Sequence, residues 1–220
     1  RILTQISIKG NQVPMSPICL FVFNRPEHTE KTLIALEKNN LAAFSELFIF
    51  SDAARDHKDE VLVAKVREII RKPWGFAKIH LIEREKNWGL AQSIISGVTE
   101  VIQKFGQVIV LEDDLLTSPY FLQFMNEALD IYAGENKVAA IHGYVWPLQP
   151  SMEKGFFLRG ADCWGWATWR RAWDLFEEDG ALLKGKLEEQ GLQREFDVNN
   201  SYPYMQMLKD QISGKNNSWA

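Results

Sequence analysis

The chain has 220 residues, 46% hydrophobic and 25% charged, which is typical of a soluble globular protein with one substantial domain. The formal net charge of −4 argues against broad binding of nucleic acids. No apolar run approaches the roughly 20 residues of a membrane-spanning helix, and no signal-peptide core is visible at the N-terminus. The chain begins without Met and ends at Trp219 and Ala220 with no terminating signal, which is typical of a fragment truncated at its C-terminus.

The two cysteines, Cys19 and Cys163, lie far apart and show no metal-binding or redox spacing. They are therefore predicted to be reduced, as in a cytoplasmic protein. Peripheral association with the inner face of a membrane is compatible with this location.

Apolar strand-like segments alternate with amphipathic helices in the first half of the chain. Buried strands are predicted at residues 18–23, 47–51 and 78–82. The helices that follow are predicted to begin at Pro26, to carry Leu62 on a core face, and to begin near Leu90. The polar residues 53–59 are expected to form a loop. This alternation predicts a parallel α/β sheet, whose ligands bind at the carboxyl ends of the strands.

A fourth apolar strand, residues 108–111, runs directly into three carboxylates, Glu112, Asp113 and Asp114. On the residues alone, two interpretations are open. Acids at the end of a buried strand are typical of a site for Mg²⁺ or Mn²⁺ shared with a substrate phosphate. They are also compatible with a solvated acidic turn at the start of a helix that begins at Ser118 and Pro119.

The second half is more irregular. Strands are predicted at 138–142 and 155–158, a strand or turn rich in tryptophan at 161–169, and a helix from 171 to about 177. A polar stretch rich in lysine and glutamate and a last amphipathic helix around Leu208 complete the chain. No repeat or linker marks a domain boundary.

Polar side chains follow the ends of several predicted strands and are expected to converge on one rim of the sheet. Arg25 is suited to a base or a phosphate, Asp52 to accept from a base, Asp113 to accept from a ribose, and Asp114 to bind a cation. For any one of these residues alone, a surface turn is the more common explanation, so the prediction depends on their convergence.

Three motifs match a known family in order and spacing: Phe23-Asn24-Arg25-Pro26, Ser51-Asp52, and Glu112-Asp113-Asp114-Leu115 before Ser118-Pro119. They resemble GT-A glycosyltransferases, in particular the branch of N-acetylglucosaminyltransferase I and bacterial family-2-like sugar transferases. The resemblance covers residues 18 to about 169. It implies a mostly parallel sheet flanked by helices with a Rossmann-like N-terminal half. It also implies one domain, 1–220, with a nucleotide-sugar-binding half at 17–118 and an acceptor-side half at 119–220.

By this resemblance, Asp114 coordinates Mn²⁺ or Mg²⁺ on the donor diphosphate. The implied donor-binding residues are Arg25, Asp52, Asn87, Gly89, Leu90, Glu112, Asp113 and Asp162. Residues 159–166 resemble the family's next landmark, beneath donor sugar and acceptor. There Trp164 is predicted to bind the acceptor through its aromatic face. Trp166 is a second candidate for acceptor binding, although core packing is the favoured interpretation for it.

An inverting transfer needs a base that deprotonates the acceptor hydroxyl. In the resembled branch this base is an Asp two residues before a Trp, and the matching residue here is Asn217, which cannot act as a carboxylate base. Misalignment, replacement by Asp210 and altered chemistry all remain open, and Asp210 is equally compatible with a solvated helix position. His142 is interpreted as a structural residue.

The resemblance implies metal-dependent transfer of a hexosyl or N-acetylhexosaminyl group from a nucleotide-diphosphate sugar, foremost a UDP-sugar, with inversion. The implied acceptor is a glycan or glycolipid in surface polysaccharide synthesis. A sugar nucleotidyltransferase is disfavoured because its glycine-rich loop is missing. A non-catalytic carbohydrate- or nucleotide-sugar-binding module on the same fold is the alternative, motivated by Asn217. The absence of Walker, dinucleotide-binding and nucleophile-elbow motifs argues against an ATPase, a dehydrogenase and an esterase.

Overall fold

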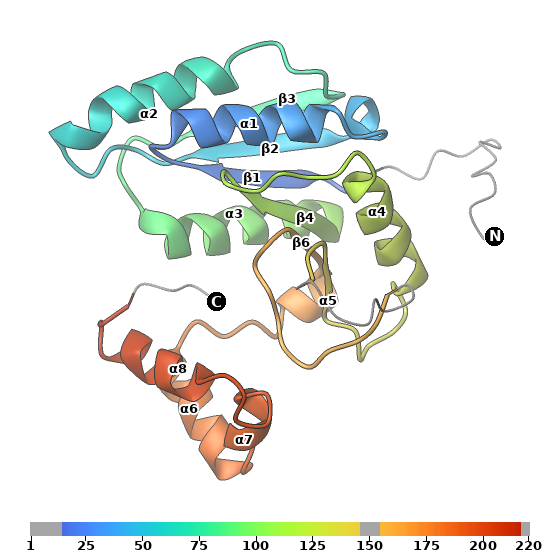
Figure 1. Cartoon of the computed structure of the whole chain (residues 1–220), viewed down its shortest axis with the longest axis vertical. Coiled ribbons are helices and arrows are strands. Elements are labelled where there is room, and N and C mark those ends of the chain that lie inside the picture. Colours follow the sequence, from blue (N-terminus) through green and yellow to red (C-terminus); the bar gives the residue numbers. More distant parts are fainter. Residues whose placement is uncertain (1–14, 146–154, 217–220) are drawn as a thin grey trace.

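A computed structural model describes residues 15–145 and 155–216, in which six strands form one sheet of order β3-β2-β1-β4-β6-β5 (Figure 1). The strands are β1 (Ile18–Val22), β2 (Glu46–Ser51), β3 (Lys78–Glu83), β4 (Gln107–Glu112), β5 (Ala140–His142) and β6 (Trp166–Trp169). Pairing is parallel from β3 through β2 and β1 to β4, and antiparallel between β6 and both its neighbours. The predicted mostly parallel α/β sheet with a Rossmann-like first half is therefore confirmed.

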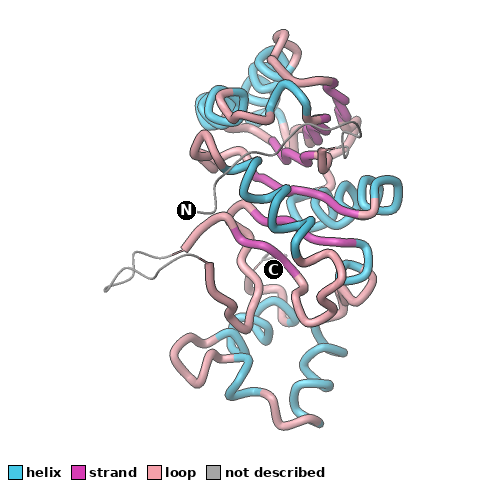
Figure 2. The backbone as a smooth tube through the Cα atoms, turned by 90° about the vertical axis from the view of Figure 1, so that its right-hand side faces the viewer, coloured by secondary structure: helices cyan, strands magenta, loops and turns pink. Residues whose placement is uncertain are grey.

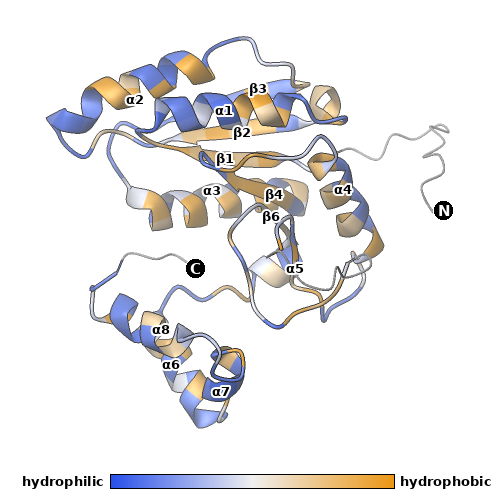
Figure 3. Cartoon of the chain, viewed as in Figure 1, coloured by the Kyte–Doolittle hydropathy of each residue, from blue (hydrophilic) through white to orange (hydrophobic). Residues whose placement is uncertain are grey.

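Helices cover both faces of the sheet. In the first 131 residues, the described helices are α1 (Pro26–Glu37), the short 3₁₀ turn η1 (Ala42–Phe44), α2 (His57–Ile70), α3 (Gly89–Phe105) and α4 (Phe121–Ile131). In Figure 1, α1 and α2 lie above the sheet and α3 lies beneath it. Figure 3 shows the apolar strands between these helices.

Alternation along each strand separates two hydrophobic clusters. Leu20 of β1 belongs to the cluster that contains Leu33 of α1 and Val66 of α2. Its neighbour Phe21 belongs to the opposite cluster, with Ile94 of α3. Successive side chains of a strand point to opposite faces, so both faces of β1 are buried.

Local chemistry explains where the helices differ from the sequence prediction. Helix α2 begins at His57, inside the predicted loop 53–59, because the Asp56 side chain accepts a 2.8 Å hydrogen bond from the Lys58 backbone N–H. Leu62 is 37% exposed and Leu90 is 48% exposed, so their predicted core positions are wrong. Val63, one position further along α2, is buried instead.

The described helices after β6 are α5 (Arg170–Trp173), α6 (Gly180–Glu189), α7 (Gln193–Phe196) and α8 (Tyr204–Ile212). Two of these four helices, α5 and α8, correspond to predicted helices, whereas the polar stretch between them forms two helices, α6 and α7, that the sequence did not predict. The Asp179 side chain begins α6 by accepting from the backbone N–H groups of Ala181 and Leu182 at 2.9 and 3.1 Å. Figures 1 and 2 show α6, α7 and α8 side by side at one end, away from the strands.

Residues 155–158 lie within the described ranges, 15–145 and 155–216. Residues 155–158 form no strand there, so the strand predicted for them is wrong. No helix within 15–145 and 155–216 is both long and apolar enough to cross a membrane. The single-domain division of the chain stays a prediction.

Candidate active site

The register of the parallel strands brings their carboxyl ends to one edge of the sheet. Val22 of β1 pairs with Ser51 of β2, Ser51 pairs with Glu83 of β3, and Phe21 of β1 pairs with Glu112 of β4. The residues that follow these strands therefore share one rim, as the motif order predicted.

Arg25 and the acidic triplet meet on this rim. Arg25 Nη1 lies 3.0 Å from Asp114 Oδ2, and Arg25 Nη2 contacts Asp113 Oδ1. Helix α1 fixes the backbone on both sides, because the Thr32 hydroxyl donates to the Asp113 carbonyl at 2.9 Å and the Thr29 hydroxyl donates to the Arg25 carbonyl at 3.0 Å. Residues 88 or more positions apart thus form one ion-pair network.

Asp113 is the buried member of this network. Its side chain is 3% exposed, and burial raises the pKa of its carboxyl although the neighbouring Arg25 guanidinium opposes that shift. Within the described residues, Asp113 Oδ2 is buried without a hydrogen-bond partner. The pKa of Arg25 is raised because the charges of Asp113 and Asp114 outweigh the lowering effect of burial.

The acidic triplet is not the start of a helix. Helix α4 begins at Phe121, with Tyr120 at its cap position, so Glu112, Asp113 and Asp114 lie outside its first turn. The prediction that this helix begins at Ser118 and Pro119 is wrong. The position of α4 therefore does not support the interpretation of the triplet as the start of that helix.

A divalent cation fits these residues only if it is shared with a substrate. Within 15–145 and 155–216, no three His, Cys, Asp or Glu side chains are arranged to hold an ion. Mg²⁺ and Mn²⁺ are commonly bound by one or two carboxylates together with phosphate oxygens, a donor set that Asp114 and Glu112 can supply in part. Asp114 is 43% exposed and thus open to such a ligand.

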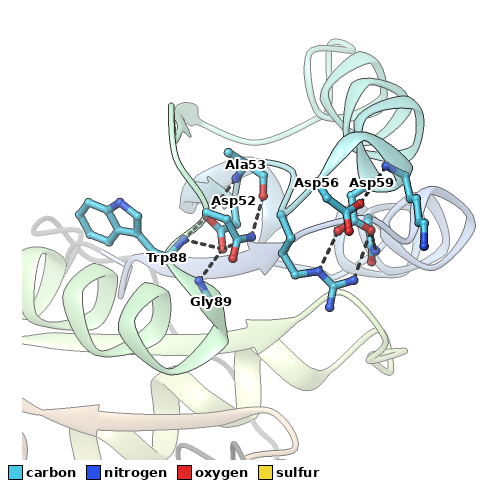
Figure 4. Close-up of polar contacts among 10 residues, drawn as sticks. Asp52, Ala53, Asp56, Asp59, Trp88 and Gly89 are labelled. Atoms are coloured by element: carbon cyan, nitrogen blue, oxygen red, sulfur yellow. Dashed lines mark hydrogen bonds and ion pairs between the residues drawn. The ribbon is translucent and has the colours of Figure 1, made fainter.

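Asp52 braces the neighbouring loop (Figure 4). Its Oδ1 accepts from the backbone N–H groups of Ala53 and Trp88, both at 2.9 Å, and its Oδ2 accepts from Gly89 N at 2.9 Å and Asn87 Nδ2 at 3.0 Å. These bonds join the end of β2 to the start of α3. Because both carboxylate oxygens are already occupied, the predicted role of Asp52 in accepting from a nucleobase stays a prediction with no support from these contacts.

A second network on the rim was missed in the sequence. Asn24 Nδ2 donates to Asp59 Oδ1 at 2.6 Å, and Arg55 Nε donates to Asp59 Oδ2 at 2.7 Å (Figure 4). These hydrogen bonds, from Arg55 first and Asn24 second, lower the pKa of Asp59 to about 2. The available signal was the four-residue spacing of Arg55 and Asp59, which becomes informative once Asp56 is recognised as a helix cap.

Trp88 and Arg84 extend the rim beyond Asp52. The Arg84 guanidinium lies 3.6 Å from the centre of a Trp88 ring, and the Trp88 side chain is 42% exposed. A shallow hollow lies beside them, lined in part by Ile82 and Lys86. Neither Arg84 nor Trp88 was predicted to belong to the site.

The loop 159–164 lies near the acidic triplet, because the charges of Glu112 and Asp114 act on Cys163. Burial first, and then the charges of Glu112 and Asp162, raise the pKa of the Cys163 thiol to about 11. Burial likewise raises the pKa of Tyr204 on α8, with further contributions from Tyr202 and Asp162. The charge of Asp162 therefore acts both on Cys163, near the acidic triplet, and on Tyr204 of α8.

His142 stands beside the same loop. Burial lowers the pKa of its imidazole, and the charge of Asp162 partly opposes this shift. Its Nδ1 is buried without a hydrogen-bond partner among the described residues, so this nitrogen is not presented to a substrate. The interpretation of His142 as a structural residue stays a prediction.

The two tryptophans predicted to bind the acceptor have different surroundings. Trp164 is 42% exposed, and its indole lies edge-to-face with Tyr144 at a ring separation of 4.9 Å. Trp166 is 6% exposed and stacks on Trp173 within the core. A buried indole cannot offer its face to a sugar, so the position of Trp166 favours core packing.

The predicted bases are not brought to the rim by any described contact. Asp210 Oδ1 accepts from Gln206 Nε2 at 2.9 Å and lies 3.6 Å from Lys215 Nζ, so these partners are local to α8 and the turn after it. Asn217 lies outside the described residues.

No protein-family model and no curated protein matches the chain. Among solved structures, the mannosyltransferase PcManGT of Pyrobaculum calidifontis, bound to GDP-mannose and Mn²⁺, shares 16% identity at a TM-score of 0.44 over 58% of this chain and 34% of its own. TarS of S. aureus, residues 1–349, shares 14% identity at a TM-score of 0.46 over 71% and 47%. Glucosyl-3-phosphoglycerate synthase of Mycobacterium tuberculosis, with Mn²⁺ and UDP, shares 13% at a TM-score of 0.38 over 58% and 43%.

These solved structures are of the GT-A type that the motifs resemble. The chain spans between about a third and a half of the length of these three.

Proposed function

We propose that the chain carries the donor-binding half of a metal-dependent glycosyltransferase that uses a nucleotide-diphosphate sugar. The observation that carries this proposal is the contact between Arg25 and Asp114, which joins the ends of β1 and β4 at 3.0 Å. It places a cation suited to a diphosphate beside a half-exposed carboxylate suited to a metal.

The proposed role of each residue follows from its exposure to solvent. Asp114, with Glu112 at the end of β4, would hold Mn²⁺ or Mg²⁺, which when bound neutralises charge on the leaving diphosphate. Arg25 pairs with the diphosphate, and the buried Asp113 holds Arg25 in place. Asp52 keeps Asn87 and Gly89 at the start of α3, where the exposed Leu90 and the indole of Trp88 offer contact area to the donor.

The acceptor side of the proposal rests on Asp162 and Trp164. The exposed indole of Trp164 suits the apolar face of a sugar ring, and its backbone N–H donates to Asp162 Oδ1 at 3.0 Å. A UDP-sugar as donor, a glycan or glycolipid of surface polysaccharide synthesis as acceptor, inversion, and a cytoplasmic location at or near the membrane belong to the same proposal.

Calorimetric titration with UDP, and in parallel with GDP, tests the donor half. We expect Mn²⁺ to strengthen binding of one nucleotide to the wild-type protein and to have no such effect on Asp114→Asn. Asp130→Asn, on the exposed side of α4, is the charge-matched control and should behave as wild type. Equal affinities with and without Mn²⁺ in the wild type contradict the proposal.

Turnover separates the enzyme from the non-catalytic binding module. Release of UDP from UDP-sugars should be lost in Asp210→Asn if Asp210 is the proposed base, and in Asp162→Asn if the carboxylate beside the triplet takes that role. Asn217→Asp should raise the rate if the motif position at 217 is the base position. Donor binding by the wild type and by Asn217→Asp, with turnover in neither, would favour the binding module.

A further inference from the structure

The two carboxylates that share Arg25 differ in their exposure to solvent. The side chain of Asp113 is 3% exposed, whereas that of Asp114 is 43% exposed. Arg25 itself is 44% exposed and carries one terminal nitrogen toward each of them. The network thus has a buried contact and a solvated contact.

The buried contact is costly to break. Within the described residues, Asp113 Oδ2 has no hydrogen-bond partner, and the remaining oxygen contacts Arg25. Loss of Arg25 would leave the buried carboxylate without its charged partner. The solvated contact with Asp114 contributes little by comparison, because exposed ion pairs are screened and gain little free energy.

We propose that Arg25 is an exchangeable counter-ion whose buried contact is an anchor and whose solvated contact is given up when the donor binds. Without ligands, Arg25 Nη1 neutralises Asp114. When Asp114 turns to a divalent cation, Nη1 pairs instead with the donor diphosphate while Nη2 stays on Asp113. The inference rests on the proposed function and goes beyond it, because it makes Arg25 the residue that couples metal binding to diphosphate binding.

This exchange has two consequences of definite sign. Arg25 competes with a cation for Asp114, so the protein without donor should bind metal weakly. Asp114 competes with a diphosphate for Arg25, so removal of its charge should release Arg25 to a diphosphate even without metal. A static role of Arg25 in donor binding predicts neither effect.

A double-mutant cycle in EDTA tests the second consequence, with UDP as the probe. We expect Asp114→Asn to bind UDP about five- to tenfold more tightly than wild type in the absence of metal. The same substitution made in Arg25→Gln should give no gain. Absence of a gain in the first case, or an equal gain in both backgrounds, overturns the proposal, because the latter reflects only removal of a negative charge.

Binding of Mn²⁺ alone, followed by the electron paramagnetic resonance of free Mn²⁺, tests the first consequence. Arg25→Gln should bind Mn²⁺ about three- to tenfold more tightly than wild type. Arg71→Gln is the matched control, because Arg71 pairs through Nε and Nη2 with Glu83 at 2.8 and 2.6 Å on the exposed surface. Unchanged or weaker Mn²⁺ binding in Arg25→Gln overturns the proposal.

Arg25→Lys guards against a fold that does not tolerate Gln beside the buried Asp113. A lysine ammonium offers one point charge that can stay on Asp113 but cannot pair with both carboxylates as the guanidinium fork does. It should therefore also abolish the gain from Asp114→Asn. Failure of the wild type to bind UDP or GDP with Mn²⁺ would remove the proposed function itself, whereas Mn²⁺-dependent binding with additive effects in the cycle removes only the exchange.

Discussion

The carboxylate of Asp52 accepts a 2.9 Å hydrogen bond from the backbone N–H of Gly89, so the end of β2 holds the first residue of α3. Gly89 has φ +76°, a left-handed conformation that side chains other than glycine rarely adopt. The start of α3 thus depends on a carboxylate 37 residues earlier in the chain and on a glycine that tolerates the turn.

Replacement of Asp52 by Ala should therefore destabilise the protein. The side chain is 6% exposed, and its loss leaves the N–H groups of Trp88 and Gly89 without their acceptor. We expect the free energy of unfolding to fall by about 3 kcal/mol. Urea unfolding followed by circular dichroism measures it.

Asp56→Ala is the control for this effect. Asp56 also accepts at a helix start, but through one described hydrogen bond, from Lys58 N at 2.8 Å at an exposed position. Its loss should cost about 1 kcal/mol. Equal losses for the two variants would show that Asp52 is an ordinary cap and not a brace between two elements.

The sequence predicted which residues share the rim because the parallel arrangement of the strands determines where their carboxyl ends lie. Once the strands at residues 18–22 and 107–112 are known to be neighbours in parallel, Arg25 and Asp114 must emerge at the same edge. It could not predict which polar groups pair across that edge. The Asn24 amide bonds to Asp59, 35 positions away, and no local pattern encodes that contact.

The second half was harder to predict because its local signals are weak. Helix α6 contains glycines and has no buried residue in its structure, so no apolar stripe marks it in the sequence. Trp166 is a second example. All four residues of its strand, WATW, are buried, so the strand shows no alternation of buried and exposed positions from which the burial of a single indole could be predicted.

Gly97 in the middle of α3 should not tolerate a methyl group. A Cβ there would lie 2.7 Å from Phe21 Cε1 and 3.1 Å from Phe50 Cε1, and these two rings are stacked in the core at 5.0 Å. Gly97→Ala should lower the free energy of unfolding by about 1 to 3 kcal/mol, because overpacking outweighs the better helix propensity of alanine. Thermal and urea unfolding provide the measurement.

At Gly185, in contrast to Gly97, replacement by alanine should raise the free energy of unfolding. Gly185 lies in α6, and a Cβ there meets nothing within 4 Å. Gly185→Ala should raise the free energy of unfolding by about 0.5 to 1 kcal/mol through helix propensity alone. If both glycine variants shift stability in the same direction, the close approach of α3 to Phe21 is not what decides the outcome at Gly97.

Asp59 should make stability depend on pH at the acidic end. Its pKa is lowered from 3.8 to about 2, so the folded state binds fewer protons than the unfolded state between these values. The stabilisation from Asp59 is therefore complete above about pH 4 and is lost as the pH falls through about 2. Unfolding curves of wild type and Asp59→Asn from pH 5 to pH 2 should converge toward the acidic end. Parallel curves throughout this range would show that Asp59 is not held by Arg55 and Asn24 in solution.

Cys163 should report on the charge of the acidic triplet. Its pKa is raised to about 11 by burial and by the charges of Glu112 and Asp162, so little thiolate exists at pH 8, and alkylation by iodoacetamide should be at least about tenfold slower than that of a free cysteine. Glu112→Gln removes one of these charges and should shift the alkylation profile to lower pH. Glu127→Gln on α4 should leave the profile unchanged, and Cys163→Ser should abolish labelling, because Cys19 is fully buried. A profile that does not respond to Glu112→Gln would show that the loop 159–164 does not lie near the triplet in solution.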